Sequence, residues 1–155
     1  MPKILVIMGS KSDVEVGRNI MGVLERFGVT ASLLVASAHR TPQRVCDLVR
    51  ESDAKVFIAV AGLSAALPGA VAAATIRPVI GVPVSGKVNL DSILSIVQMP
   101  PGIPVGTVGL DRGENAALLA VEILAIEDDE LAGRLREYRE EMALTVVQDS
   151  KEVEY

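Results

Sequence analysis

The segment Ser37–Pro42 contains the only histidine of the 155-residue chain, His39, next to a permanent cation, Arg40. An imidazole has an ordinary pKa of about 6.5, so it can give or take a proton at neutral pH. A guanidinium presents a planar fork of donors that suits a phosphate or a carboxylate. Thr41 and Pro42 are typical of a helix N-cap and a first helical residue. We therefore expect proton-transfer and anion-binding groups together at the electropositive start of a helix. A lone histidine is also common as a structural or surface residue, so catalysis needs support from the rest of the chain.

A second polar segment, Gly9–Asp13, follows an apolar run and precedes an amphipathic stretch. Its amides and the hydroxyls of Ser10 and Ser12 are suited to an anion at a helix start. Ser10 and Asp13 also fit a capping box, and the sequence leaves both interpretations open. A carboxylate beside an anion site is useful mainly for binding hydroxyl groups, which favours a sugar phosphate. The segment matches neither the P-loop nor the dinucleotide pattern, so it indicates neither a triphosphate nor a dinucleotide.

Small residues dominate the stretch from Gly62 to Thr75. Such a stretch can bring backbone close to a small flat ligand or can pack tightly in a core or an interface, and its composition favours packing. The single cysteine, Cys46, lies in an amphipathic stretch and is expected to be a buried apolar residue rather than a nucleophile. One histidine and one cysteine form no ligand cluster, so no metal site is expected.

Composition limits the possible classes of protein. The chain is 50% hydrophobic, which is enough to bury a core as one domain over residues 1–155, with a core over 3–126 and a C-terminal helix at about 128–147. A net charge of −5 and few aromatic side chains argue against binding to nucleic acid or to an anionic membrane. No apolar run is long enough to span a bilayer and no signal-peptide pattern is present, so we expect a soluble, cytoplasmic protein.

Apolar runs alternate with amphipathic stretches along the chain. Strands are predicted over residues 3–8, 29–36, 56–61, 78–82 and 104–109. Helices are predicted over about 15–27, 42–52, 62–75, 91–98 (with Asp91 as its cap), 115–126 and 128–147. This alternation indicates an α/β fold with a parallel sheet covered by helices on both faces. Ligands bind beyond the carboxyl ends of such strands, so the segments 9–13, 37–40, 62–66, 83–89 and 109–113 should share one edge.

Six segments together resemble one known family. They are residues 9–13, 37–42, 67–69, 78–84, 91–100 and 115–120, in colinear order between Ile4 and about Ala125. The chain resembles the N5-carboxyaminoimidazole ribonucleotide mutase and aminoimidazole ribonucleotide carboxylase family of purine biosynthesis. The resemblance implies a three-layer α/β/α, flavodoxin-like fold and a homo-octamer with active sites at subunit contacts. It implies a ribonucleotide monophosphate and carbon dioxide as the small-molecule partners and no cofactor.

The resemblance also implies roles for individual residues. His39 would be the general acid and base, and Ser10, Asp13 and Arg40 would bind the ribose phosphate. The remaining substrate-binding candidates are Gly9, Ser12, Ser37, Ala38, Gly62, Ser64, Ala66 and Leu67. In the implied reaction a carboxyl group leaves the exocyclic nitrogen as carbon dioxide, which a ring carbon recaptures before His39 removes the proton from that carbon.

Two features depart from the family pattern. Ala66 stands where bacterial mutases of the family typically carry a second histidine, and the loop from Ser85 to Leu90 is shorter and contains Lys87. The first departure leaves open an aminoimidazole ribonucleotide carboxylase that takes carbon dioxide directly. An alternative from another class is a non-catalytic, nucleotide-binding oligomeric scaffold that has kept its phosphate site and lost turnover.

Overall fold

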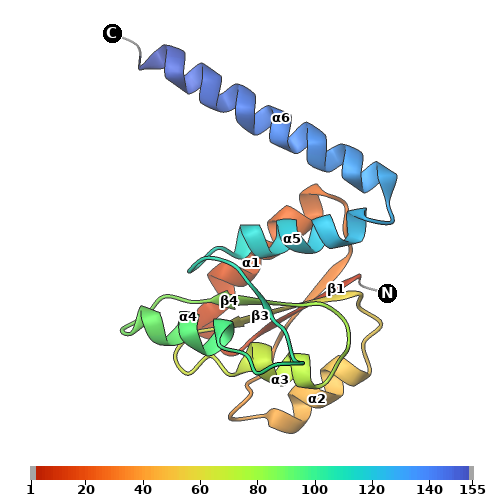
Figure 1. Ribbon diagram of the computed structural model, residues 1–155, viewed down its shortest axis with the longest axis vertical. Coiled ribbons are helices and arrows are strands. Elements are labelled where there is room, and N and C mark those ends of the chain that lie inside the picture. The colour runs from red at the N-terminus through yellow and green to blue at the C-terminus, as the bar shows by residue number, and fades with distance from the viewer. Residues whose placement is uncertain (1–2, 154–155) are drawn as a thin grey trace.

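Five parallel strands form the central sheet of the computed structural model, which describes residues 3–153 (Figure 1). Their order across the sheet is β2-β1-β3-β4-β5. The strands are β1 (Ile4–Met8), β2 (Ala31–Val35), β3 (Val56–Ala61), β4 (Val79–Pro83) and β5 (Gly106–Thr107). All four pairings are parallel, and every residue of β1, β3 and β4 is buried. These runs are apolar at every position because helices cover both faces of the sheet.

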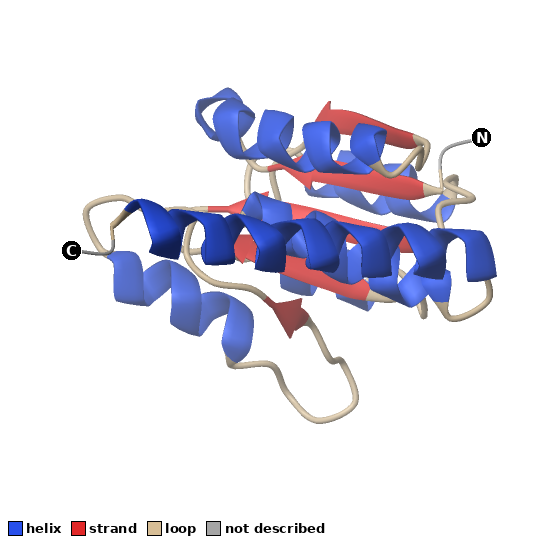
Figure 2. Cartoon of the chain, turned by 90° about the horizontal axis from the view of Figure 1, so that it is seen from above, coloured by secondary structure: helices blue, strands red, loops and turns tan. Residues whose placement is uncertain are grey.

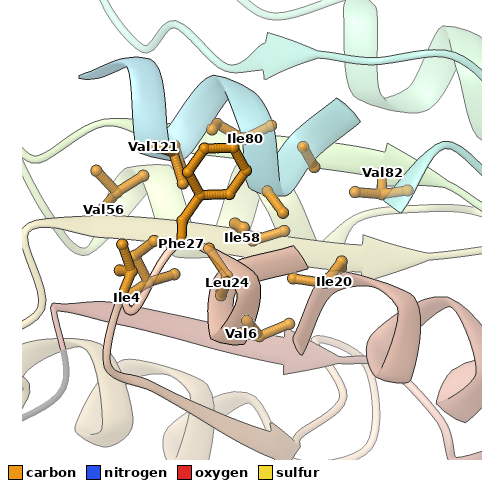
Figure 3. Close-up of a cluster of buried hydrophobic side chains, with 14 of the residues drawn as sticks. Ile4, Val6, Ile20, Leu24, Phe27, Val56, Ile58, Ile80, Val82 and Val121 are labelled. Carbon is orange, nitrogen blue, oxygen red and sulfur yellow. The ribbon is translucent and has the colours of Figure 1, made fainter. Parts of the chain in front are cut away.

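Helices form the two outer layers, in front of and behind the strands in Figure 2. They are the short 3-10 helix η1 (Lys11–Asp13), α1 (Val14–Arg26), α2 (Pro42–Arg50), α3 (Leu67–Ala73), α4 (Asn89–Val97), α5 (Gly113–Ala125) and α6 (Asp129–Glu152). Alternate side chains of β1 enter different cores, as the period of two in a strand requires. Ile4 and Val6 pack with α1 and α5 (Figure 3), and Leu5 and Ile7 pack with α2, α3 and α4. The predicted three-layer α/β/α fold is confirmed.

The layer formed by α1 and α5 is closely packed. A Cβ atom added to Gly113, the first residue of α5, would lie 2.8 Å from the carbonyl oxygen of Val16 and 3.0 Å from Ile20. Only glycine permits this approach of the two helices. The contact fixes the start of α5 against α1, the helix that follows the polar segment Gly9–Asp13.

The C-terminal helix α6 extends away from the rest of the chain in Figure 1. Its first turns are attached, since Leu131 is buried, Arg134 donates to the carbonyl oxygen of Phe27, and Tyr138 meets the ring of Phe27 edge to face. Beyond these turns the helix exposes several apolar side chains, namely Met142, Leu144, Val146 and Val147.

Several predicted boundaries were wrong. The predicted helix over residues 62–75 is confined to α3, because Ser64 lies in the left-handed region before it and Pro68 occupies its first turn. The fifth strand is two residues long instead of six, and Pro104 cannot donate to a neighbouring strand. Helix α4 begins at Asn89, so Asp91 is not its cap. Helix α5 begins two residues earlier than expected and α6 runs five residues further, while β2 is shorter at both ends. Within residues 3–153, no helix is both long and apolar enough to cross a bilayer.

Candidate active site

Three loops that follow β1, β2 and β3 meet at the carboxyl edge of the sheet and enclose a cavity of about 350 Å³. All twelve residues singled out from the sequence line it: Gly9, Ser10, Ser12, Asp13, Ser37, Ala38, His39, Arg40, Gly62, Ser64, Ala66 and Leu67. Ala61, Leu63 and Ala65 complete the lining and were not singled out individually. Ala61 is the last residue of β3, while Leu63 and Ala65 lie in the segment 62–66 that was expected at this edge. Residues far apart in the sequence therefore line the same cavity.

The other two post-strand loops, 83–89 and 109–113, do not line this cavity. They are joined to each other, because the amide of Asp111 donates to the carbonyl oxygen of Pro83 at 2.8 Å and the amide of Ser85 donates to Asp111 Oδ1 at 2.7 Å. All five predicted loops lie at the carboxyl edge of the parallel sheet, and the Val84 amide also donates to the carbonyl oxygen of Ala61 at 3.0 Å, but only three of the loops line the cavity. Lys87 lies in loop 83–89 and does not line the cavity.

A closed turn presents His39 and Arg40. Thr41 occupies the N-cap position of α2 and Pro42 its first turn, as expected. The Thr41 hydroxyl does not cap the helix, however. It accepts a hydrogen bond from the Ser37 amide at 2.9 Å and donates to the Ser37 carbonyl oxygen at 3.2 Å. These two hydrogen bonds close the turn from Ser37 to Thr41, and within it the side chains of His39 and Arg40 are exposed at the cavity.

Arg40 connects two of the three loops. One terminal nitrogen of its guanidinium donates to the carbonyl oxygen of Gly9 at 3.0 Å, and Nε donates to the Ser37 hydroxyl at 3.3 Å. A guanidinium has five N–H donors, so those not used in these two contacts remain for an anion. The contacts orient the side chain before any ligand arrives.

Asp13 is a buried carboxylate at this cavity, with a relative exposure of 7%. Burial raises its pKa above the ordinary value, and this effect outweighs the Ser12 hydroxyl, the Ser10 backbone and the positive charge of Arg40, which all lower it. The Ser10 hydroxyl accepts from the Ser12 amide at 3.3 Å, so the capping interpretation holds for Ser10. A carboxylate kept at the cavity at this cost in solvation is typical of a functional site.

Replacing Asp13 with asparagine is expected to stabilise the unliganded chain at neutral pH. Because the pKa of Asp13 is raised on folding, the folded chain binds this proton more tightly than the unfolded chain does. Its contribution to stability is therefore greatest at low pH and is lost as pH rises from about 4 through the folded-state pKa. Thermal unfolding between pH 3 and pH 8 should give Asp13→Asn a higher Tm at pH 7 and no gain at pH 3.

The matched control for this experiment is Asp53→Asn, which alters an exposed aspartate outside the cavity. Because the Asp53 side chain is exposed, its replacement should not give the gain in Tm at pH 7 that is expected for Asp13→Asn. A lower Tm for Asp13→Asn at pH 7 would contradict the assignment of burial as the dominant effect on this carboxylate.

The third loop has a strained centre. Ser64 has a φ of 51°, in the left-handed region that non-glycine residues rarely adopt. Its amide donates to Asp91 Oδ2 at 2.5 Å, and its carbonyl oxygen accepts from the Ala66 amide at 2.5 Å. Ala66, where the resemblance to bacterial mutases leads us to expect a histidine, contributes only a methyl side chain to the cavity lining. Sequence reasoning missed the contact with Asp91, because the two residues lie 27 positions apart and no local pattern joins them.

The histidine, cysteine, aspartate and glutamate residues among positions 3–153 form no group of three that could hold a metal ion. Hydrogen-bond donors, one imidazole and a small apolar wall are the chemical groups that the cavity offers. They can bind an anion, orient a flat ring and move a proton.

A parallel sheet of order 2-1-3-4-5, with a cavity beyond the carboxyl ends of its strands, defines a flavodoxin-like α/β protein. Sequence comparison makes the assignment specific. The chain belongs to the AIR carboxylase family, whose model matches residues 3–145. This finding confirms the resemblance noted from the six sequence segments.

Individual relatives cover nearly the whole chain. A protein of Methanocaldococcus jannaschii named N5-carboxyaminoimidazole ribonucleotide mutase is 55% identical over 151 residues, covering 97% of this chain and 96% of its own. A protein of Pyrococcus abyssi with the same name is 53% identical over 147 residues, covering 92% of this chain and 84% of its own. The crystal structure of Treponema denticola PurE superposes with a TM-score of 0.90 at 30% identity, covering 100% of both chains.

Proposed function

We propose that this chain is an enzyme of purine biosynthesis, an isomerase that converts N5-carboxyaminoimidazole ribonucleotide to 4-carboxyaminoimidazole ribonucleotide. Two relatives that carry the mutase name are more than half identical to it over nearly its whole length. The observation that carries the proposal is the meeting of Ser10, Asp13, His39 and Arg40 around one cavity. This combination of groups suits a sugar phosphate and proton transfers by one imidazole.

Polar groups of the first two loops hold the ribose phosphate in this proposal. Arg40 and the Ser10 hydroxyl bind the phosphate, supported by amides and hydroxyls of Gly9, Ser12 and Ser37. Asp13 accepts hydrogen bonds from the ribose hydroxyls. The positive charge of Arg40 already lies close enough to lower the pKa of Asp13, so one ligand can reach both side chains.

The aminoimidazole ring and the released carbon dioxide lie against the third loop. Gly62, Ser64, Ala66 and Leu67 of this loop, together with Ala38, line the cavity, and most of these side chains are small or apolar. Such surface favours carbon dioxide over water, so the released molecule stays beside the ring. The ring carbon belongs to an enamine and is already nucleophilic. Orientation and confinement therefore supply most of what the reaction needs, and the proposal includes no cofactor.

One imidazole balances the protons of the reaction. When the carboxyl group leaves the exocyclic nitrogen as carbon dioxide, that nitrogen must gain one proton. When the ring carbon bonds to carbon dioxide, it must lose one proton to restore the aromatic ring. His39 donates the first and accepts the second, so it ends in the state in which it began. The exposed position of His39 at the cavity supports this role.

An assay with two substrates tests the proposal. Purified protein is given N5-carboxyaminoimidazole ribonucleotide, or aminoimidazole ribonucleotide with bicarbonate, and the ultraviolet absorbance of the ring-carboxylated product is followed. Turnover of the first substrate at low bicarbonate is expected. Activity only with the second substrate at high bicarbonate would select the direct carboxylase, the alternative that Ala66 raises. Ligand binding without any product would select the nucleotide-binding scaffold.

The proposal extends to a homo-octamer in the cytoplasm, with active sites at subunit contacts. The apolar side chains that α6 exposes, such as Leu144 and Val147, support burial against other copies. The lone cysteine, Cys46, is compatible with a reducing compartment. Light scattering on the purified protein should give eight times the chain mass of 16.3 kDa.

A further inference from the structure

Asp91, which lies outside the cavity, accepts a hydrogen bond from Ser64, the cavity residue with a positive φ. Its side chain lies in the first turn of α4, and Oδ2 accepts the 2.5 Å hydrogen bond from the Ser64 amide. Ser64 lines the cavity, whereas Asp91 is not among the described residues that do. A positive φ at a serine persists only where surrounding contacts impose it. The carboxylate is an acceptor with a full charge, and a hydrogen bond to such a group is stronger than one between neutral groups.

Helix α4, which carries Asp91, is firmly packed against the sheet. The neighbouring Ser92 is 1% exposed, and its hydroxyl donates to the carbonyl oxygen of Asn89 at 2.9 Å. One turn further along α4, Ile96 is fully buried. It lies against Gly81 of β4 so closely that Gly81 has no room for a side chain. Helix α4 is therefore fixed to the sheet, and its carboxylate has a defined position from which to hold Ser64.

The conformation of Ser64 sets the path of this loop along the cavity, where every residue from Ala61 to Leu67 contributes to the lining. Leu63, Ser64 and Ala66 are exposed, while Ala65 between them is buried with a relative exposure of 1%. The carbonyl oxygen of Ser64 accepts the amide of Ala66, which begins the approach to α3. If Ser64 relaxed to a negative φ, the chain direction would change at this point. The wall proposed to confine the ring and carbon dioxide would then lose its shape.

We propose that Asp91 is a positioning residue for the reaction, which keeps Ser64 in the left-handed conformation and so holds the wall from Gly62 to Ala66 in place. This inference rests on the proposed function. Helix α4 would then influence the reaction through Asp91 by positioning the loop, although α4 contributes no side chain to the cavity lining.

Kinetics of Asp91→Ala test the inference. The variant should lose about 10- to 100-fold in kcat, because small misplacements at a reacting centre cost this much. Its KM should stay within about threefold, since Ser10, Asp13 and Arg40 are unaltered. The matched control is Asp111→Ala. Asp111 also has a positive φ and accepts a backbone amide at 2.7 Å, but it lies outside the cavity, so its kcat should be unchanged.

Two further variants separate positioning from general damage to the fold. Asp91→Asn keeps an oxygen that can accept from Ser64 and should retain kcat to within about fivefold. In a Ser64→Gly background, the further change Asp91→Ala should cost little kcat, because glycine adopts a positive φ without strain. The double variant should therefore have nearly the same kcat as Ser64→Gly alone. The inference is overturned if Asp91→Ala keeps full kcat, or if the double variant shows the same loss that Asp91→Ala causes alone.

Hydrogen exchange at the Ser64 amide gives a readout that does not depend on the reaction. In the unliganded Asp91→Ala protein this amide should exchange faster than in the unaltered chain, while amides of the buried strand β3 keep their rates. An unchanged rate at Ser64 would overturn the inference even if the enzyme is active. Faster exchange in a chain without mutase activity would instead reject the proposed function and support Asp91 as the residue that holds the loop.

Discussion

The variant His39→Asn is expected to bind the ribonucleotide and to turn it over about 10²- to 10⁴-fold more slowly than the unaltered chain. Asparagine has a similar shape and polarity but cannot carry a proton at neutral pH. His39 is exposed, so its replacement leaves both cores intact. The loss should therefore appear in kcat, with ligand affinity changed by less than about threefold.

Steady-state kinetics measure kcat, and calorimetric titration with aminoimidazole ribonucleotide measures the ligand affinity. Gln43→Ala is the matched control, since Gln43 lies in the first turn of α2, is exposed, and does not line the cavity. A kcat for His39→Asn within about threefold of the unaltered value would exclude general acid and base catalysis by this residue. An equal loss of affinity and rate would show that His39 binds substrate and does not transfer the proton.

The variant Arg40→Met is expected to raise KM by about 100-fold or more. Methionine approximates the aliphatic part of the arginine side chain but has no charge and no N–H donors. A hydrogen bond to a charged group contributes about 1.5–3 kcal/mol, and a guanidinium can make two of them to one phosphate. The contacts of Arg40 with Gly9 and Ser37 are lost as well, so the two loops also lose their connection.

Arg44→Met provides the comparison for this loss. Arg44 lies on α2, is exposed, and donates to the carbonyl oxygen of Val35 at 3.3 Å, but it is outside the cavity. Both variants remove one positive charge from a chain with a net charge of −5, so any effect of overall charge is equal in the two. Arg40→Lys should bind substrate more tightly than Arg40→Met, because lysine keeps the positive charge but lacks the planar set of guanidinium donors. Equal KM values for Arg40→Met and Arg44→Met would rule out Arg40 as the phosphate ligand.

Residue types and periodicity alone were sufficient to predict the fold class. Runs such as 56–61 are apolar at every position, and amphipathic stretches separate them, so a parallel sheet between two helical layers was the expected arrangement. The chemistry-bearing residues could be selected for the same reason. A lone imidazole beside a guanidinium, and a serine-rich turn after a strand, are rare enough in this composition to be noticed without coordinates.

The tertiary structure determines which of these groups come into contact, and it sets their burial, pKa and backbone conformation. The 3.0 Å contact of Arg40 with Gly9 spans 31 positions, and the contact of Asp91 with Ser64 spans 27. Neither leaves a local pattern, because a hydrogen bond between distant segments depends on where the sheet carries them. The burial that raises the pKa of Asp13 and the positive φ of Ser64 are likewise set by neighbours in space. The sequence by itself determined the elements and the candidate chemistry, whereas the shape and polarity of the cavity arise only when distant loops come together.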